Sequence, residues 1–182
     1  MELFRNIRLK IGSALLKKRI SRVNRKMKYN NFSEVKTIGV VWNASKYEEF
    51  QSLARFHQRM MERNIDVKII GYYHDKNLPD QYTAIRYLTC IRKSETNLFH
   101  IPSSDEAKSF INNNFDILVD INSEKLFTLN YITILSRAAF KVGIFENESE
   151  ESPFDLMMEI KKPVNIEDYL KQVIQYLEMI KS

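Results

Sequence analysis

Cysteine, glycine and proline are all scarce in this chain of 182 residues. The single cysteine excludes an intramolecular disulfide framework and a zinc site built from several thiolates. Four glycines leave little material for a phosphate-binding loop, and neither G-x-G-x-x-G nor a Walker loop occurs. Long apolar runs are also missing, and Arg8, Lys10 and Lys17 interrupt the segment where a secretory signal needs an apolar core.

What the chain does have is an ordinary core composition and an uneven charge. Hydrophobic residues make up 44% of the sequence, enough for one domain of common size. Eleven of the 28 Lys and Arg residues lie within residues 1–36, where only two carboxylates occur. That segment carries +9 and the remainder −4. Such asymmetry indicates an anionic partner, and it says nothing about the fold.

The N-terminal segment has helical periodicity. Apolar residues recur at three- and four-residue spacing, namely Leu3, Phe4, Ile7, Ile11, Ala14 and Leu15. This pattern predicts a long amphipathic helix over residues 2–28, with a break near Gly12. We expect two parts, a basic helical arm at residues 1–32 and an α/β domain at residues 36–182. Two arrangements fit the arm: it docks on the domain through these apolar residues, or it is free.

Strands and helices are expected to alternate along the rest of the chain. Apolar runs predict strands over 37–42, 66–73, 115–121, 140–145 and 154–160, with a short edge strand over 98–101. Helical spacing predicts helices over 45–63, 103–111, 126–139 and 166–180, the first two opened by capping boxes at Ser45 and Ser103. Residues 82–91 fit a short helix or an irregular strand.

This alternation predicts the fold class. It is typical of a mostly parallel sheet of about five or six strands covered by helices on both faces. We therefore expect an α/β protein, a Rossmann-like three-layer sandwich preceded by the basic amphipathic helix.

The densest cluster of positive charge is the main candidate binding site. Seven cations fall within twelve residues: Lys17, Lys18, Arg19, Arg22, Arg25, Lys26 and Lys28. Contacts between such side chains and phosphates release counterions, which gives tight, salt-sensitive binding to nucleic acid. The alternatives are an anionic membrane surface that also takes up the apolar residues, and a solubilising helix without a specific partner. No motif of a DNA-binding module is present.

A second candidate site follows from the expected topology. Ligands of parallel sheets bind beyond the carboxyl ends of the strands, where the strand order reverses. The polar residues expected there form a possible ligand pocket: Asn43, Ser45, Asp120, Asn122 and Glu146. Each also has an ordinary structural explanation as a helix cap or part of a solvated acidic loop. No residue stands out as catalytic, no metal site is predicted because the three histidines lack ligand spacing, and no cofactor is expected.

Three segments resemble a family of known sequence pattern. They are the "I-G-V" run at Ile38–Val40, the "F-D-I-L-V-D" run at Phe115–Asp120 and the "L-S-R-A-A-F-K-V-G" run at Leu135–Gly143. Together with the basic N-terminal helix, they resemble a small bacterial family of unknown function. The resemblance implies a Rossmann-like body and no activity. Residues 116–143 also resemble the amino-terminal half of heptosyltransferase-type glycosyltransferases, from which no catalytic residue carries over.

The sequence thus favours a binding protein over an enzyme. We expect the arm to contact RNA or a ribonucleoprotein, with the α/β body as a scaffold. One alternative is a peripheral membrane or complex-assembly protein that uses the same helix and a protein or lipid partner. Another is a small-molecule-binding or transferase-like enzyme acting at the strand ends. The expected location is the cytoplasm, with attachment at the inner face of the membrane under the first alternative.

Overall fold

A computed structural model describes residues 2–29, 31–75, 78–145, 152–160 and 165–180. Its centre is a six-stranded sheet in the order β3-β2-β1-β4-β5-β6, and all neighbouring strands are parallel. The strands are β1 (Thr37–Asn43), β2 (Asp66–Tyr73), β3 (Leu88–Arg92), β4 (Ile117–Asp120), β5 (Phe140–Ile144) and β6 (Leu156–Met158). The predicted α/β sandwich with a parallel sheet is confirmed.

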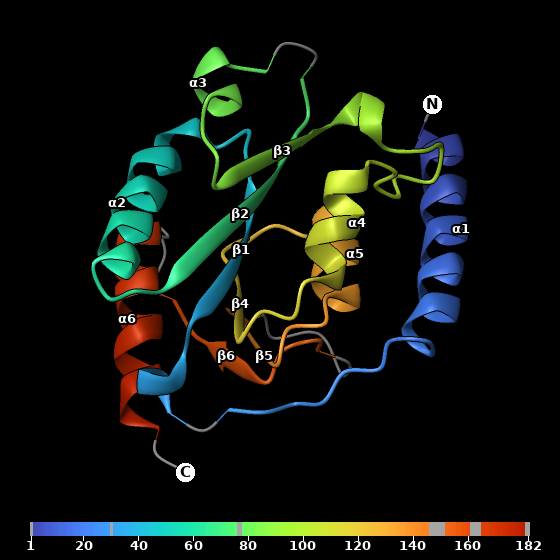
Figure 1. Cartoon of the computed structure of the whole chain (residues 1–182). Coiled ribbons are helices and arrows are strands. Elements are labelled where there is room, and N and C mark those ends of the chain that lie inside the picture. The colour runs from blue at the N-terminus through green and yellow to red at the C-terminus, as the bar shows by residue number, and fades with distance from the viewer. Residues whose placement is uncertain (1, 30, 76–77, 146–151, 161–164, 181–182) are drawn as a thin grey trace.

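Helices cover both faces of this sheet (Figure 1). The helices of the described residues are α1 (Glu2–Ile20), α2 (Phe50–Met61), α3 (Asp80–Thr83), α4 (Asp105–Asn112), α5 (Phe127–Leu135) and α6 (Ile166–Met179). Helices α2 and α6 pack on one face, and α4 and α5 on the other. Short 3-10 turns lie at Phe32–Glu34, Tyr47–Glu49 and Lys93–Glu95.

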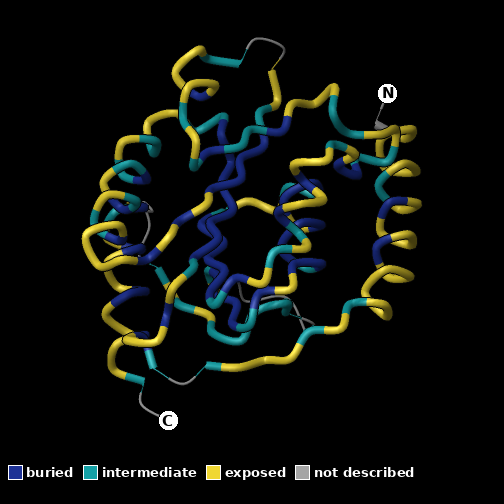
Figure 2. Tube along the Cα trace, in the orientation of Figure 1, coloured by how far each residue is buried: buried dark blue, intermediate teal, exposed yellow. Residues whose placement is uncertain are grey.

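The sheet is buried because its strands are apolar on both faces. In β1, for example, Ile38, Val40 and Trp42 face the α2 and α6 layer while Val41 faces the α4 and α5 layer. All four are fully buried. Such continuous apolar strands suit a parallel sheet, whose crossover helices cover each side. Figure 2 shows the buried residues gathered in the sheet and on the inner sides of the helices.

The strand order reverses between β1 and β4, because the chain winds outward from β1 to β3 and then returns to β4. This is the strand order of the dinucleotide-binding Rossmann fold. The loops after β1 and β4 are therefore the place where the topology opens a crevice, and both carry residues predicted as pocket candidates.

Some predicted elements have different boundaries. The edge strand predicted over 98–101 is wrong: the edge strand is β3, ten residues earlier, and His100 has a positive φ of 59° in a turn. The helix predicted to reach residue 28 ends at Ile20, and it is not broken at Gly12. Neither capping box forms as predicted, since α2 begins at Phe50 after a 3-10 turn and α4 is capped by Ser104.

Candidate functional site

The helix α1 is docked on the body, against α5. Leu16 is buried with Tyr131 and Leu135 of α5 and with Ile101. Gly12 faces the Phe99 backbone and the first residue of α5: a Cβ there would lie 2.6 Å from the carbonyl oxygen of Phe99 and 3.0 Å from the Phe127 ring. Only glycine permits this approach, which accounts for a glycine inside an unbroken helix.

The last turn of α1 is attached through Arg19. Its guanidinium donates a hydrogen bond to the hydroxyl of Tyr131 and lies 5.7 Å from the centre of the same ring. Burial raises the pKa of Tyr131, and the neighbouring Arg19 charge acts against that shift. Arg19 therefore stabilises the docked helix and is less available to an outside partner than the sequence suggested.

The segment that follows α1 is held by Arg25. Its Nε donates to the carbonyl oxygen of Ala138 at 2.7 Å, and its Nη2 donates to that of Ala139 at 3.2 Å and pairs with Asp155. The backbone N–H of Lys28 donates to the Ala139 oxygen at 3.0 Å. The helix ends at Ile20, and the segment that makes these contacts is not helical.

The other five predicted cations point away from the body. The side chains concerned are exposed and, in the described part of the chain, form no ion pair: Lys17, Lys18, Arg22, Lys26 and Lys28. The structure thus divides the predicted binding cluster into two cations used within the protein and five left toward solvent.

The same side of α1 exposes large apolar residues. The exposed fractions are 70% for Leu3, 70% for Phe4, 46% for Ile7, 40% for Ile11 and 38% for Leu15. At 100° per residue these positions share a stripe about 120° wide, pointing away from α5. Lys10 and Lys17 run along one edge of the stripe and Arg8 along the other. We call this surface, residues 3–18 on the solvent side of α1, the outer face of α1.

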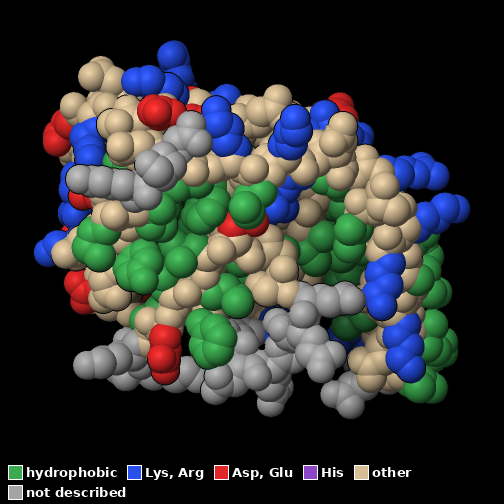
Figure 3. All heavy atoms as spheres, turned by 90° about the horizontal axis from the view of Figure 1, so that it is seen from below, with side chains coloured by type: hydrophobic (Ala, Val, Ile, Leu, Met, Phe, Trp, Pro, Cys, Tyr) green, Lys and Arg blue, Asp and Glu red, His purple; other side chains and the backbone are tan. Residues whose placement is uncertain are grey.

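Figure 3 looks at the molecule from below, with α1 at the right-hand side. Hydrophobic side chains are exposed along that edge, next to Lys and Arg side chains, and no red carboxylate is visible among them there. The exposed surface of α1 is therefore both apolar and cationic.

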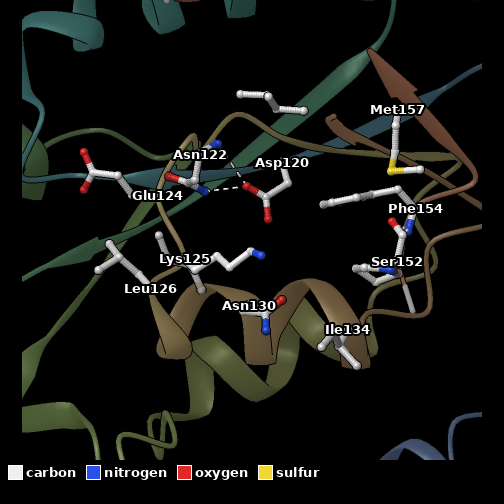
Figure 4. Close-up of a pocket in the computed structure, with 13 residues that line it drawn as sticks. Asp120, Asn122, Glu124, Lys125, Leu126, Asn130, Ile134, Ser152, Phe154 and Met157 are labelled. Atoms are coloured by element: carbon white, nitrogen blue, oxygen red, sulfur yellow. Dashed lines mark hydrogen bonds between the residues drawn. The ribbon is translucent and has the colours of Figure 1, made fainter. Parts of the chain in front are cut away.

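A pocket of about 250 Å³ opens at the carboxyl ends of β4 and β5 (Figure 4). It is bounded by the loop after β4, by one side of α5 and by the segment before β6. The polar lining residues are Asp120, Asn122, Glu124, Lys125, Asn130 and Ser152. The apolar lining residues are Leu126, Leu129, Ile134, Ile144, Pro153, Phe154 and Met157.

The buried carboxylate of Asp120 is fixed at one side of this pocket. One oxygen accepts a hydrogen bond from the Thr133 hydroxyl at 2.6 Å. The other accepts from the backbone N–H of Asn122 at 3.0 Å and from its side-chain amide at 2.5 Å. That amide also donates to the carbonyl oxygen of Val41 at 3.1 Å. The loop after β4 is thereby tied to β1.

A buried lysine extends the polar network under α5. The ammonium group of Lys141, whose residue is 2% exposed, donates to the carbonyl oxygens of Thr133 at 2.7 Å and Ile134 at 2.9 Å. These are carbonyls at the C-terminal end of α5, where a cation is favourable. Burial, and after it the Arg25 charge, lower the pKa of Lys141 to about 7, while Asp155 acts in the opposite direction.

Of the five predicted pocket residues, the structure places two in the pocket. Asp120 and Asn122 line it, whereas Asn43 and Ser45 lie on the other side of the crevice. The Asn43 side chain accepts from the backbone N–H of Ser45 at 3.2 Å, and the Ser45 hydroxyl accepts from that of His74 at 3.2 Å. Both therefore act as turn residues. Glu146 lies outside the described residues.

An ion pair formed by Lys46 spans these two sides of the crevice. Lys46, after β1, pairs with Glu124 at 3.2 Å and contacts the Ser123 hydroxyl at 3.5 Å, both after β4. On the β1 side, the Trp42 indole donates to Glu49 at 3.0 Å, and burial raises the pKa of Glu49 to about 7 despite this bond. The Lys46–Glu124 pair thus spans the strand reversal, and the pocket lies beside it, over the ends of β4 and β5.

Sequence reasoning missed four residues that shape the site: Lys125, Thr133, Lys141 and Phe154. Only Lys141 carried a signal, as a charged residue between Phe140 and Val142 in a predicted buried strand. Thr133 and Phe154 reach the site through tertiary packing. Within the described ranges, no cluster of three metal-ligating side chains is found, and no helix is long and apolar enough to cross a membrane.

Comparison with known proteins agrees with the resemblance seen in the sequence. No curated protein matches the chain. The model of a family of unknown function, DUF6913, matches residues 8–180, which includes most of α1 as well as the whole sheet. The chain, arm and body together, therefore belongs to the family DUF6913.

Proposed function

We propose that this protein is a peripheral membrane protein that binds anionic lipid surfaces through the outer face of α1. The observation that carries the proposal is the stripe of five large apolar side chains that folding leaves exposed beside lysines that form no ion pair with any described residue. Such a stripe with flanking cations is the pattern of helices that lie in the plane of the membrane interface.

The energetics support a reversible attachment. Full burial of a Leu, Ile or Phe side chain contributes about 1.5–3 kcal/mol, and each cation near an anionic surface adds about 1 kcal/mol. Leu3, Phe4 and Ile7 are exposed enough for a large part of this gain to remain available after folding. Lys10 and Lys17, at the edge of the stripe, can reach the headgroups while their stems stay apolar.

The docking of α1 sets the orientation of the body. Gly12 and Leu16 face α5, so the helix meets a surface with its opposite side while the sheet stays in water. Arg25 and its carbonyl contacts hold the following segment, which keeps α1 at a fixed angle to the sheet. The inner face of the membrane, rich in anionic lipids, is the surface that this charge fits.

Nucleic acid is the second candidate, because five exposed cations lie between residues 17 and 28. RNA would use these charges and stack its bases on aromatic rings. The exposed stripe contains one aromatic residue, Phe4, and four aliphatic ones, which base stacking does not use. Lipid accounts for both the charges and the aliphatic residues, and we therefore place it first.

Flotation of the full chain with phosphatidylcholine vesicles, with and without phosphatidylglycerol, tests the proposal. We expect binding to the anionic vesicles and weakening at high salt. The variant Ile7→Glu/Ile11→Glu is expected to lose at least about 100-fold in affinity, because two apolar contacts are replaced by charges. The matched control is Met61→Glu, which changes an exposed apolar residue on α2 and is expected to bind normally.

The vesicle experiment distinguishes lipid, RNA and a second copy of the chain as the partner of the stripe. Equal binding of the double variant and the wild-type protein overturns the proposal. If vesicles are not bound while a single-stranded RNA is, and Lys17→Gln/Lys18→Gln weakens that binding, the nucleic-acid alternative is correct. A dimer in solution that Ile7→Glu/Ile11→Glu dissociates would assign the stripe to a second copy instead. Circular dichroism and thermal unfolding check that the variants remain folded.

A further inference from the structure

Five basic side chains meet where the N-terminal half of α1 passes the carboxyl edge of the sheet. They are Arg5 and Arg8 of α1, His74 after β2, Lys93 after β3 and His100 in the turn before α4. We propose that this group, which we call the His100 cluster, binds the phosphate group of a small phosphomonoester. The inference does not rest on lipid binding, because the cluster is centred on His100, on the body side of α1.

Close packing brings the two arginines of α1 to the turn at residues 97–101. A Cβ at Gly12 would lie 2.6 Å from the carbonyl oxygen of Phe99, so α1 touches this turn. Figure 1 shows the turn beside the N-terminal half of α1. At 100° per residue, Arg5 and Arg8 lie within about 40° of Gly12 around the helix axis. Both arginines are therefore on the side of α1 that meets the turn.

The sheet supplies two further members of the cluster. Strands β2 and β3 are neighbours, and Tyr73 pairs with Arg92 in their register. His74 and Lys93 directly follow that pair, so they occupy adjacent positions at the carboxyl edge of the sheet. The backbone N–H of His74 donates to the Ser45 hydroxyl at 3.2 Å, which holds the chain in place at this point.

His100 is held in the cluster through its backbone. Its N–H donates to the carbonyl oxygen of Asn97 at 3.0 Å, and its own carbonyl oxygen accepts from the Thr128 hydroxyl of α5 at 3.0 Å. Its φ of 59° lies in the left-handed region, which few residues other than glycine adopt. The residue is half-buried, and its ring forms no hydrogen bond with any described residue. The imidazole is therefore positioned but available to a ligand.

The cluster gathers like charges without a compensating carboxylate. Burial is the largest cause of a lowered pKa at His100, and Lys93, Arg8, Arg5 and His74 each act in the same direction. No carboxylate of the described residues acts against them there. Arg5, Arg8 and Lys93 also form no ion pair in the described ranges. Such self-repulsion destabilises the folded state, and a bound anion would relieve it.

The types of side chain favour phosphate among the anions. Guanidinium groups bind phosphate oxygens through paired N–H donors, and an ammonium group adds a compact charge. A phosphomonoester has three terminal oxygens and carries between one and a half and two negative charges near neutral pH, by the approximate values for phosphorylated side chains. It can therefore contact both arginines and Lys93 at once, whereas a carboxylate offers two oxygens and a single charge.

Calorimetric titration of the full chain at low salt and near neutral pH tests the inference. The probes are phenyl phosphate and benzenesulfonate. Both carry a phenyl ring and three terminal oxygens on a tetrahedral atom, and they differ in charge. We expect phenyl phosphate to bind with a Kd of about 1 mM or below. Benzenesulfonate, with its single charge, should bind at least about tenfold more weakly.

Two double variants locate the site. Arg5→Gln/Arg8→Gln should weaken the binding of phenyl phosphate by at least about tenfold. The matched control, Arg22→Gln/Lys26→Gln, removes the same charge from exposed positions at the other end of the N-terminal segment and should change the Kd by less than about twofold. Both variants should fold, since none of the four side chains forms an ion pair with a described residue.

Proton NMR of the three histidine rings gives a second readout. The variants His74→Gln and His100→Gln assign the signals. Phenyl phosphate should raise the pKa of His100 by about one unit, because an adjacent anion favours the charged imidazole. The pKa of His57, on α2, should stay the same.

Three results would each overturn the inference: equal affinity of the two double variants for phenyl phosphate, equal binding of benzenesulfonate, and an unchanged pKa of His100. A fourth result would assign the arginines to the lipid-binding surface instead. In that case phenyl phosphate is not bound, while Arg5→Gln/Arg8→Gln weakens binding to phosphatidylglycerol vesicles.

Discussion

Residues 2–29 have two sides that differ in their contacts with the rest of the protein. On the inner side, Gly12, Leu16, Arg19 and Arg25 each make a specific contact with the body. On the outer side, apolar residues and lysines share the exposed surface of α1, and the lysines form no ion pair in the described part of the chain. The comparison shows that a basic segment is not a single functional unit, because two of its arginines stabilise the fold while its lysines remain available.

The inner side also constrains the sequence of α1 through its packing on α5. A helix that merely carried charge would tolerate any spacing of cations. Here the spacing between Gly12, Leu16 and Arg19 is set by one face of a helix packed on α5. The outer side is under no such packing constraint, so its apolar residues need a partner to account for them.

The largest effect is expected for Arg25→Ala. The change removes two hydrogen bonds to backbone carbonyls and leaves Asp155, whose side chain is 10% exposed, without its ion-pair partner. We expect the free energy of unfolding to fall by about 3 kcal/mol. Lys26→Ala, one residue away and exposed, should change it by less than about 0.5 kcal/mol. Urea denaturation of both variants measures the difference. Equal free energies of unfolding would contradict the view that Arg25 stabilises the fold and Lys26 does not.

The buried Lys141, next to Arg25, predicts a dependence of stability on pH. Its pKa in the folded protein is about 7, below the value of 10.5 expected for the unfolded chain. Between these values the unfolded chain binds the extra proton, so stability rises as the pH increases from 7 to 9. The gain is about 2–3 kcal/mol over that range, and Lys141→Met should flatten it.

At lower pH the opposite trend is expected from Glu49. Its pKa in the folded protein is raised to about 7, so the folded state binds the extra proton between the ordinary value of 4.5 and 7. Stability contributed by this group is therefore lost as the pH rises through that window. Glu49→Gln should remove this trend and leave the rise above pH 7 unchanged. Denaturation at a series of pH values separates the two groups, and identical profiles for Lys141→Met and the wild type would refute the assignment.

Two neighbouring leucines test the two sides directly. Leu16 is 5% exposed and Leu15 is 38% exposed. Leu16→Ala should lower the free energy of unfolding by about 2 kcal/mol, since it leaves a cavity against α5, whereas Leu15→Ala should cost well under about 1 kcal/mol. The order reverses for vesicle binding, where Leu15→Ala should be the more harmful. The same order in both measurements would contradict the separation of the faces.

The smallest expected effect is that of Gly12→Ala. Alanine favours a helix by about 1 kcal/mol, but here its Cβ would press on the Phe99 carbonyl and the Phe127 ring. We expect a net loss of about 1 kcal/mol. Ser13→Ala, on the exposed side, should be neutral or slightly stabilising. A stabilised Gly12→Ala would mean that α1 is not closely packed on α5.

Much of the fold could be predicted because the spacing of apolar residues along the chain indicates which side of a strand or helix is buried. The strands at Thr37–Asn43, Asp66–Tyr73 and Phe140–Ile144 and the helix at Ile166–Met179 lie where apolar spacing placed them. The end of α1 could not be predicted, since Ile20, Val23 and Met27 continue the helical pattern. What stops the helix is the binding of Arg25 to Ala138 and Ala139, more than 100 residues away.

The candidate site divides in the same way. Asp120 and Asn122 could be named from topology, because they directly follow a central strand. Asn43 and Ser45 have the same position after β1, and yet they act as turn residues, and the neighbouring Lys46 pairs with Glu124. Tertiary packing decides which strand at the carboxyl edge of the sheet borders a hollow, and a local pattern carries no information about that packing.

The amino-acid sequence by itself determined the alternation of strands and helices, the parallel sheet and the concentration of positive charge near the N-terminus. These depend on neighbouring residues and on composition. Only the tertiary structure decided which side of α1 faces the body, which two arginines serve the fold and where the pocket lies. Each of these depends on contacts between residues distant in the chain, whose pairing is set by packing rather than by local preference.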